Sequence, residues 1–291
     1  MSTARLWFLA QTFFRKSEPF PAMPASMPPF LTTAHLAAPH AMTCRLGGVS
    51  SGAFASLNLS FYVGDEADRV RENRHRILAA LELPRLVSLK QVHGDQILVL
   101  DSTPEQSEDI PGFDAVISNV PGLALLIQQA DCQAVLLHDP KCQVVAAVHS
   151  GWRGSVMNLI GKTVTRMQAA FGVNPADLHA AISPSLGPCC AEFVNFRTEL
   201  PEWMWRFAVP DKAAHFDFWA MSSKQLAEAG LLPERIAVTG ICTRCNRDFF
   251  SFRRAKQESG GVCGRNGSLI GLPLEASRQS SPTHPPLQEQ T

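Results

Sequence analysis

Residues 123–149, LALLIQQADCQAVLLHDPKCQVVAAVH, decide the fold class. This stretch contains three apolar runs, LALLIQQ, QAVLLHD and QVVAAVH, each with the length and composition of a buried strand. Only a few residues separate the runs, and the pair Asp139 and Pro140 is a turn signal. Because no helix fits between them, the stretch does not follow an alternating βαβ pattern.

The segments on either side continue a mixed pattern. Apolar residues at helical spacing predict a helix over 66–82, a second one from Gly154 to just before Gly172, and a third over about 217–229. Strands are predicted for the runs LVSLKQV, QILVL, DAVISN, AAISP and RIAVTG, and for FFSF at 249–252. The body has no internal repeat and no long linker. We therefore expect one α+β domain with mixed sheets over residues 34–275.

The two ends of the chain differ from this body. Residues 1–33 include the Pro- and Met-rich stretch PFPAMPASMPPF, and we expect a poorly ordered extension there. The apolar run LWFLAQTFF is interrupted by Gln11 and Thr12, and no A-x-A site follows it, so a signal peptide is not expected. Residues 276–291 are polar and Pro-rich, which predicts a disordered tail.

The charge and cysteine content exclude some classes of protein. Basic and acidic residues number 26 each, so net charge gives no attraction to nucleic acid or to an anionic membrane, and we expect neither as a partner. No apolar run approaches the ~18–20 residues of a membrane span. The eight cysteines have irregular spacing. They fit reduced thiols in a cytoplasmic protein better than a small disulfide scaffold.

Three residues at or near predicted strand ends are candidates for chemistry: His93, Cys132 and His149. Zinc prefers histidine and cysteine ligands, and a His₂Cys set leaves one position of a tetrahedral ion open, as catalytic sites do. Their spacing along the chain matches no local zinc signature. The residues alone therefore leave open that they are a core thiol and two hydrogen-bonded histidines.

The turn HSGWRG, residues 149–154, is a candidate anion site. Gly151 and Gly154 allow a close backbone approach, and amides at the start of the following helix favour a negative charge. Arg153 adds a cation suited to bidentate phosphate contact. The alternative is structural, with Trp152 as a hydrophobic plug and Arg153 in a surface ion pair.

Cys242 and Cys245 form a C-x-x-C in GICTRCNRDFFSFRR. A zinc knuckle needs a second such pair, but Cys189 and Cys190 are adjacent and Cys263 stands alone. The predicted strand FFSF does not provide the helix of a thioredoxin-like motif. We therefore favour a structural role for the pair over a redox one.

The chain resembles the laccase-domain family over about residues 38–271, through motifs that occur in the same order. Members were long labelled multicopper polyphenol oxidases and are now assigned as purine nucleoside phosphorylases. The motifs are CRLGGVSSGAFASLNLSFYVGDEADRVRENR, LKQVHGD, FDAVISNVPGLALLIQQADCQAVLLHDP, AAVHSGWRG, SLGPCCAEF, GICTRCNRDFFSFRR and GRNGSLIGL.

The resemblance implies a single α+β domain of stacked mixed β-sheets flanked by helices, with one zinc ion held by His93, Cys132 and His149. It implies phosphorolysis of adenosine, inosine and methylthioadenosine to free base and ribose 1-phosphate. Purine nucleosides and phosphate are then the partners. Adenosine deamination is also attributed to the family. The preferred nucleoside, the physiological metal and the oligomeric state stay open.

Further site residues follow from this chemistry. We predict a phosphate cradle of Arg45, Arg153 and the amides around Gly151, and Gln91 of the QVHGD motif is a further candidate substrate-binding residue. Asp131, beside Cys132, is a candidate proton carrier, or alternatively a partner that orients a ligand histidine. Two positions depart from the family: Ala191 stands where relatives often carry an aromatic residue, and Cys245 occupies a variable position.

Two other enzyme classes are weighed against this one. A copper polyphenol oxidase needs a trinuclear cluster typically built on H-x-H pairs, and no two of the nine histidines form one. Copper competes with zinc at a single His₂Cys site, so oxidase activity of copper-loaded protein is an expected artefact. A cysteine hydrolase would use Cys132 as nucleophile with His93 or His149 as base. A non-catalytic binding module is the remaining alternative.

Overall fold

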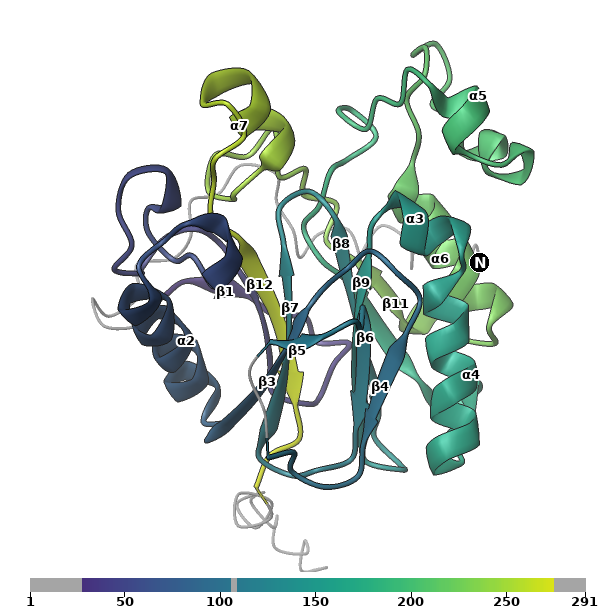
Figure 1. Ribbon diagram of the computed structural model, residues 1–291. Coiled ribbons are helices and arrows are strands. Elements are labelled where there is room, and N and C mark those ends of the chain that lie inside the picture. The colour runs from purple at the N-terminus through teal and green to yellow at the C-terminus, as the bar shows by residue number, and fades with distance from the viewer. Residues whose placement is uncertain (1–27, 106–108, 275–291) are drawn as a thin grey trace, which may run out of the picture.

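The computed structural model describes residues 28–105 and 109–274, which form two stacked six-stranded sheets (Figure 1). The first sheet has the order β1 (Phe30–Leu31), β2 (His40–Thr43), β12 (Asn266–Gly271), β7 (Leu123–Gln129), β3 (Arg85–Lys90) and β5 (Ile110–Pro111). The second has the order β11 (Ile236–Val238), β10 (His179–Ile182), β8 (Gln133–Asp139), β9 (Val144–Ser150), β6 (Ala115–Ser118) and β4 (Ile97–Leu100).

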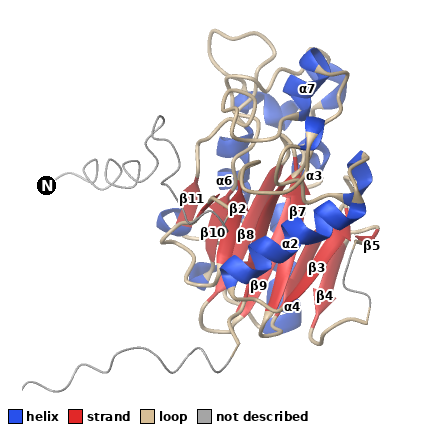
Figure 2. Cartoon of the chain, turned by 90° about the vertical axis from the view of Figure 1, so that its left-hand side faces the viewer, coloured by secondary structure: helices blue, strands red, loops and turns tan. Residues whose placement is uncertain are grey.

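Helices cover the outer faces of both sheets. Helix α2 (Ala67–Leu81) lies on the first sheet, and α4 (Leu159–Phe171) and α6 (Phe218–Glu228) lie on the second (Figures 1 and 2). Three short helices gather at one end of the sheets: α3 (Trp152–Val156), α5 (Phe196–Glu199) and α7 (Phe252–Glu258). No helix in the described part of the chain is both long and apolar enough to cross a membrane.

The layers are held together by three apolar interfaces. Residues from both sheets, including Leu125 of β7 and Leu136 of β8, pack between them. Ile160 and Val164 of α4 pack on the second sheet, and Ile77 of α2 packs on the first. Each of these side chains is fully buried, and such burial stabilises a fold by about 1.5–3 kcal/mol per large aliphatic side chain.

Both sheets are mixed. Strand β3 runs parallel to β7, whereas β12 runs antiparallel to β7. In the second sheet β8 pairs antiparallel with both β9 and β10, and β10 runs parallel to β11. The predicted α+β domain of stacked mixed sheets flanked by helices is confirmed, because the three apolar runs of 123–149 are β7, β8 and β9 without a helix between them.

Three local predictions need correction. The helix predicted from Gly154 is two helices, because Asn158 at φ 53° breaks it and its side chain accepts a hydrogen bond from the Gly161 amide. The run FFSF is not a strand: Ser251 caps α7 by accepting the Arg254 amide. Strand β1 pairs with β2, so the folded body begins before residue 34. Residues 1–27 and 275–291, where an extension and a tail were predicted, lie outside the described residues.

Candidate active site

The three predicted ligands meet at the end of the sheets that carries α3 and α7. His93 lies in the loop after β3, Cys132 at the turn that passes from β7 in one sheet to β8 in the other, and His149 near the end of β9. Their ligand atoms all lie within 4.8 Å of one another, and His93 Nε2 is 3.9 Å from Cys132 Sγ. The two imidazole rings are perpendicular, with centroids 4.8 Å apart. The fold therefore brings together three residues that are distant in sequence.

A fourth residue, Asp114, organises this group, and it is not among the site residues predicted from the sequence. It is fully buried and comes directly before β6. Its Oδ1 accepts from Nδ1 of His149 at 2.8 Å. The same carboxylate accepts three consecutive backbone amides, those of Val92, His93 and Gly94, at 3.2, 3.0 and 2.7 Å. An aspartate directly before a fully buried strand, in FDAVIS, was the available signal.

These contacts hold His93 in an unusual backbone conformation. His93 has φ 60°, a left-handed value that costs free energy for a residue with a Cβ atom. The amide bonds to Asp114 compensate for that cost and fix the loop. Asp114 thus positions both histidines, one through its ring and the other through its backbone.

The electrostatics of the group favour a thiolate next to an imidazolium. Burial disfavours the charged form of His149, but Asp114 and the Cys132 sulfur outweigh it and raise the pKa of His149 to about 9. Burial likewise opposes ionisation of Cys132, but the two histidines outweigh it and lower the pKa of Cys132 to about 6. The pKa of Asp114 is lowered, because its hydrogen bonds and the His149 charge outweigh its burial.

Gly151, predicted to bind substrate, packs against this group. A Cβ atom at this position would lie 3.0 Å from Cys132 Sγ and 3.3 Å from His93 Cδ2. The glycine therefore leaves the space that the sulfur and the ring occupy.

The donor set fits a zinc ion. Bonds of about 2.0–2.1 Å to nitrogen and 2.3 Å to sulfur place tetrahedral ligand atoms about 3.3–3.6 Å apart. The 3.9 Å between His93 Nε2 and Cys132 Sγ, and the 4.8 Å limit for the whole group, are somewhat wider, so the three side chains would draw together around an ion. Because Nδ1 of His149 is hydrogen-bonded to Asp114, its Nε2 would remain for a metal ion, an arrangement common among histidine ligands. Three protein ligands leave a fourth position open.

A cavity of about 410 Å³ is lined in part by the three predicted ligands. This size is that of a pocket for a small molecule. Its walls carry two cations that the sequence analysis did not single out, Lys90 and Arg265. The lining residues are Ser60, Tyr62, Val63, Leu89, Lys90, Gln91, His93, Gln128, Gln129, Ala130, Cys132, His149, Phe252 and Arg265.

The strand order explains why Lys90 and Arg265 line the same cavity. Lys90 ends β3, which runs parallel to β7, and Arg265 precedes β12, whose first residue Asn266 pairs with the last residue of β7, Gln129. The end of two strands and the beginning of a third therefore share one edge of the sheet. The sequence shows that each residue is a cation at the end or the start of a strand. That both line one cavity follows only from the order of the strands in the sheet.

The other predicted substrate-binding residues lie elsewhere or are already engaged. Arg45 lines a neighbouring hollow of about 140 Å³, where its Nε donates to the Ala55 carbonyl at 2.6 Å and its guanidinium lies over Phe250. Arg153 is exposed and lies over Trp152, and neither it nor Gly151 lines the cavity. Gln91 lines the cavity, but its amide exchanges two hydrogen bonds of 2.9 Å with the backbone of Gln128.

Asp131 does not orient a ligand histidine. Its Oδ1 accepts from Thr243 Oγ1 at 2.7 Å and its Oδ2 accepts from the Arg253 amide at 2.6 Å. Asp114 makes the histidine contact that we considered for it. Asp131 has φ 86° and does not line the cavity. Its two hydrogen bonds connect the turn that contains Cys132 to the loop of Thr243 and to the start of α7.

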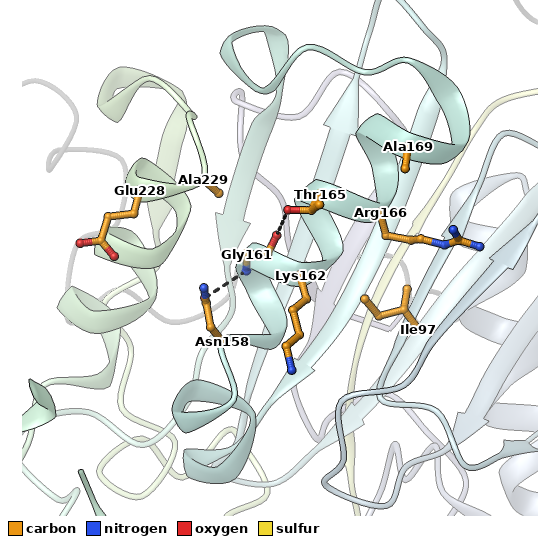
Figure 3. Close-up of a pocket in the computed structure, with 9 residues that line it drawn as sticks. All are labelled: Ile97, Asn158, Gly161, Lys162, Thr165, Arg166, Ala169, Glu228 and Ala229. Atoms are coloured by element: carbon orange, nitrogen blue, oxygen red, sulfur yellow. Dashed lines mark hydrogen bonds between the residues drawn. The ribbon is translucent and has the colours of Figure 1, made fainter.

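A larger hollow of about 580 Å³ shares no lining residue with this cavity, and Figure 3 shows the residues that line it. Lys162, Arg166 and other residues of α4 line it, together with Ile97 of β4 and the end of α6. It contains none of the three ligand residues.

Comparison with known proteins places these features in a family. The family model described as multi-copper polyphenol oxidoreductase laccase matches residues 39–273. The purine nucleoside phosphorylase YlmD of Geobacillus stearothermophilus is 32% identical over 247 residues, which cover 79% of this chain and 88% of that protein. Adenosine deaminase RL5, from an unknown prokaryotic organism, is 31% identical over 225 residues, 72% of this chain and 84% of that protein.

A solved structure agrees with these matches. The crystal structure of YlmD from Geobacillus stearothermophilus superposes with a TM-score of 0.74 at 29% identity, covering 88% of this chain and all of that one. Because the family model spans most of the chain and the relatives cover more than two thirds of it, the chain belongs to the multi-copper polyphenol oxidoreductase laccase family, as its motifs indicated.

Proposed function

We propose that this protein is a zinc-dependent purine nucleoside phosphorylase, which cleaves adenosine, inosine and methylthioadenosine with phosphate to free base and ribose 1-phosphate. The observation that carries the proposal is the cavity that has the His93, Cys132 and His149 group on one side and Lys90 and Arg265 in its walls. The relatives named as purine nucleoside phosphorylases support it. A cytoplasmic location, suited to free thiols, is part of the same proposal.

The cavity offers groups for each part of the substrates. Lys90 and Arg265 supply the positive charge that a phosphate dianion needs. Tyr62 and Phe252 supply aromatic faces against which a purine stacks. Both cations already lie near these rings, with Lys90 Nζ 4.6 Å from the Tyr62 centroid and Arg265 6.0 Å from that of Phe252.

Two further residues position the three predicted metal ligands. Asp114 orients the His149 ring through Nδ1 and fixes the loop of His93, while Gly151 leaves the space that the Cys132 sulfur and the His93 ring occupy. A zinc ion held by His93, Cys132 and His149 would supply a Lewis acid that polarises a substrate oxygen or a bound water.

Adenosine deamination is the second candidate activity, favoured by the relative named adenosine deaminase RL5. Zinc deaminases use a glutamate as general acid and base. The described residues that line the cavity include no aspartate or glutamate, and both oxygens of Asp131 accept hydrogen bonds, one from Thr243 and one from the Arg253 amide of α7. This favours phosphorolysis as the main reaction.

Product analysis tests the proposal. Zinc-quantified protein is incubated with adenosine, with and without phosphate, and the products are separated by chromatography beside the Cys132→Ala variant. Adenine and ribose 1-phosphate that require phosphate, and that disappear in the variant, are expected. Inosine formed without phosphate would make deamination the main activity, and no turnover of any purine nucleoside would overturn the proposal.

A cysteine hydrolase is the competing assignment, because Cys132 Sγ lies 3.9 Å from His93 Nε2. Iodoacetamide separates the two. A nucleophilic Cys132 reacts in metal-free and zinc-loaded protein alike, whereas a zinc ligand is protected by the metal. A copper polyphenol oxidase would need several copper ions, and we expect copper-loaded protein to hold one ion at the His₂Cys group and to lack multicopper chemistry.

A further inference from the structure

Four cysteines outside the active site form a second group of thiols. Cys189 and Cys190 lie in the loop that follows β10, and Cys242 and Cys245 lie in the loop that follows β11. All four sulfur atoms lie within 4.8 Å of one another. Cys245 Sγ is 3.6 Å from that of Cys189 and 3.4 Å from that of Cys190. The C-x-x-C therefore has a partner pair, which the sequence analysis did not find because the adjacent cysteines match no second C-x-x-C.

The fold brings the two loops together. Strands β10 and β11 are parallel neighbours, so both loops leave the same edge of the sheet. Beyond the strands, Ser185 forms a bridge with the second loop: its amide donates to the Ile241 carbonyl at 3.1 Å, and its carbonyl accepts the Thr243 amide at 3.0 Å. Backbone pairing thus sets the distance between the cysteine pairs before any sulfur contact is made.

Three local features hold the two loops so that the four sulfurs lie close together. The Asn246 amide donates to the Cys242 carbonyl at 2.9 Å, which closes the turn that holds Cys242 and Cys245. Gly187 lies where a Cβ atom would be 3.0 Å from the Cys242 Cβ, so the glycine permits the close approach of the first loop. Arg254 fastens the second loop, since its Nη1 donates to the carbonyls of Thr243 and Arg244 at 2.8 and 2.9 Å.

The spacing of the sulfurs matches a tetrahedral zinc site. Zinc–sulfur bonds of about 2.3 Å place the four sulfurs of a tetrahedron about 3.8 Å apart. A disulfide would instead bring two of them to about 2.05 Å, and all four cysteines are free. Four thiolates fill every position of the ion, which is the closed arrangement of structural rather than catalytic zinc.

The surroundings compensate for the charge of such a site. Four thiolates around a divalent cation carry two net negative charges. Arg244 Nη1 donates to Cys190 Sγ at 3.4 Å, and the Lys212 ammonium donates to the Cys189 carbonyl. Cys190 and Cys242 are buried, whereas Cys189 and Cys245 are exposed, so an ion has a route into the site from solvent.

We propose that Cys189, Cys190, Cys242 and Cys245 bind a second zinc ion that ties the two loops together. Binding converts four thiols to thiolates and releases up to four protons, with no change in oxidation state. The two cysteine loops also contact the turn that contains Asp131 and Cys132. The Leu186 amide donates to the Asp131 carbonyl at 2.8 Å, and Thr243 Oγ1 donates to Asp131 Oδ1 at 2.7 Å, so the zinc ion would help to hold this turn in place. The proposal does not depend on the reaction that the protein catalyses.

Metal content of full-length protein is the first test. Protein reconstituted with zinc and freed of excess ion is expected to hold two equivalents per chain. Cys132→Ala and Cys245→Ser are each expected to hold one, and the double variant none. Cys142→Ser, at an exposed cysteine of the β8–β9 turn outside both groups, is the matched control and keeps two. Wild type with one equivalent, all of it lost in Cys132→Ala, would overturn the proposal.

Alkylation of the wild-type protein tests the site without a mutation. Zinc is expected to slow iodoacetamide labelling of Cys189 and Cys245 roughly tenfold or more, as followed by peptide mass spectrometry, because a metal-bound thiolate is shielded. Removal of zinc by a chelator restores labelling, and Cys142 reacts equally in both states. Labelling of Cys189 and Cys245 as fast as Cys142 in zinc-loaded protein, or a disulfide among the four cysteines, would contradict the proposal.

Cobalt substitution identifies the ligands. Cobalt-loaded Cys132→Ala is expected to keep the intense sulfur-to-cobalt charge-transfer absorption of a four-thiolate site, and Cys245→Ser is expected to lose part of it. An absorption spectrum that the Cys132→Ala change abolishes would assign all thiolate ligation to the active site and reject the second site.

Discussion

The buried carboxylate of Asp114 and the imidazole of His149 form a hydrogen-bonded pair, with 2.8 Å between Oδ1 and Nδ1. The pair sits at the junction of β6 and β9, where the His149 amide also donates to the Asp114 carbonyl at 2.7 Å. Because the same carboxylate holds the loop of His93, one residue controls the geometry of two of the three predicted metal ligands.

Asp114→Asn is expected to lower zinc affinity by about 10–100-fold and to reduce activity with it, because the amide presents only one acceptor oxygen to four donors. Competition with a chromophoric chelator measures the affinity. Asp95→Asn is the control, since Asp95 lies in the same loop but is paired on the surface with Lys162. Unchanged zinc affinity in Asp114→Asn would show that the carboxylate does not position the ligands.

Gly151→Ala is expected to lower zinc affinity roughly tenfold or more, because the site tolerates little displacement and the new methyl group would lie 3.0 Å from Cys132 Sγ. The same chelator competition measures the change, with circular dichroism as a check on folding. Gly154→Ala is the matched control: its nearest contact would be the His149 carbonyl oxygen at 3.4 Å, an ordinary van der Waals distance, and it would touch none of the three predicted ligand side chains. Equal affinities for both variants would argue against the packing role of Gly151.

Lys90→Ala and Arg265→Ala are each expected to raise the KM for phosphate about tenfold, because each removes a cation suited to a charge-assisted hydrogen bond with the anion. Initial rates at varied phosphate and saturating nucleoside measure the effect. Arg153→Ala serves as the comparison, since Arg153 lies outside the cavity lining. A larger rise in the KM for phosphate in Arg153→Ala than in the other two variants would indicate that phosphate binds at the HSGWRG turn instead.

Asp131→Asn is expected to lower the free energy of unfolding by about 1–2 kcal/mol, through weaker hydrogen bonds to Thr243 and the Arg253 amide. Asparagine also tolerates the left-handed backbone of this position. Activity with zinc present should stay close to wild type. Denaturant titration and initial rates measure the two effects, and a large loss of turnover at unchanged stability would instead make Asp131 a proton carrier.

The buried His138 on β8 is expected to make stability depend on pH. Burial, with smaller effects of the His179 and His40 charges against an opposing effect of Asp139, lowers its pKa from 6.5 to about 4. The unfolded chain therefore binds a proton that the folded chain does not between these values. Stability is full above about pH 6.5 and falls by on the order of 3 kcal/mol as the pH drops toward 4.

His138→Leu tests this origin, because the variant removes a side chain whose Nδ1 finds no hydrogen-bond partner among the described residues. Unfolding free energies measured between pH 4 and 7 should decline less steeply in the variant than in wild type. The exposed His75 on α2 provides the control substitution His75→Leu. Identical slopes for wild type and His138→Leu would place the acid sensitivity elsewhere.

Local sequence determined the elements of this fold. The apolar runs of 123–149 are three strands because their length and composition suit burial on both faces. Helix α2 follows from its periodicity, and α6 begins directly after its N-cap Asp217, whose side chain accepts the Ala220 amide. The two wrong secondary-structure predictions also have local causes. Ser251 caps α7 where the run FFSF predicted a strand, and Asn158 separates α3 from α4 where one helix was predicted.

The sequence by itself also supplied His93, Cys132 and His149, through residue type and through motifs similar to those of a family. Tertiary structure alone decided what surrounds them. Asp114, Lys90 and Arg265 reach the site because β3, β6, β7 and β12 end or begin at one edge of the stacked sheets. The four cysteines meet because β10 and β11 are neighbours. Strand order depends on contacts between residues far apart in the chain, whereas spacing along the chain reports only local periodicity.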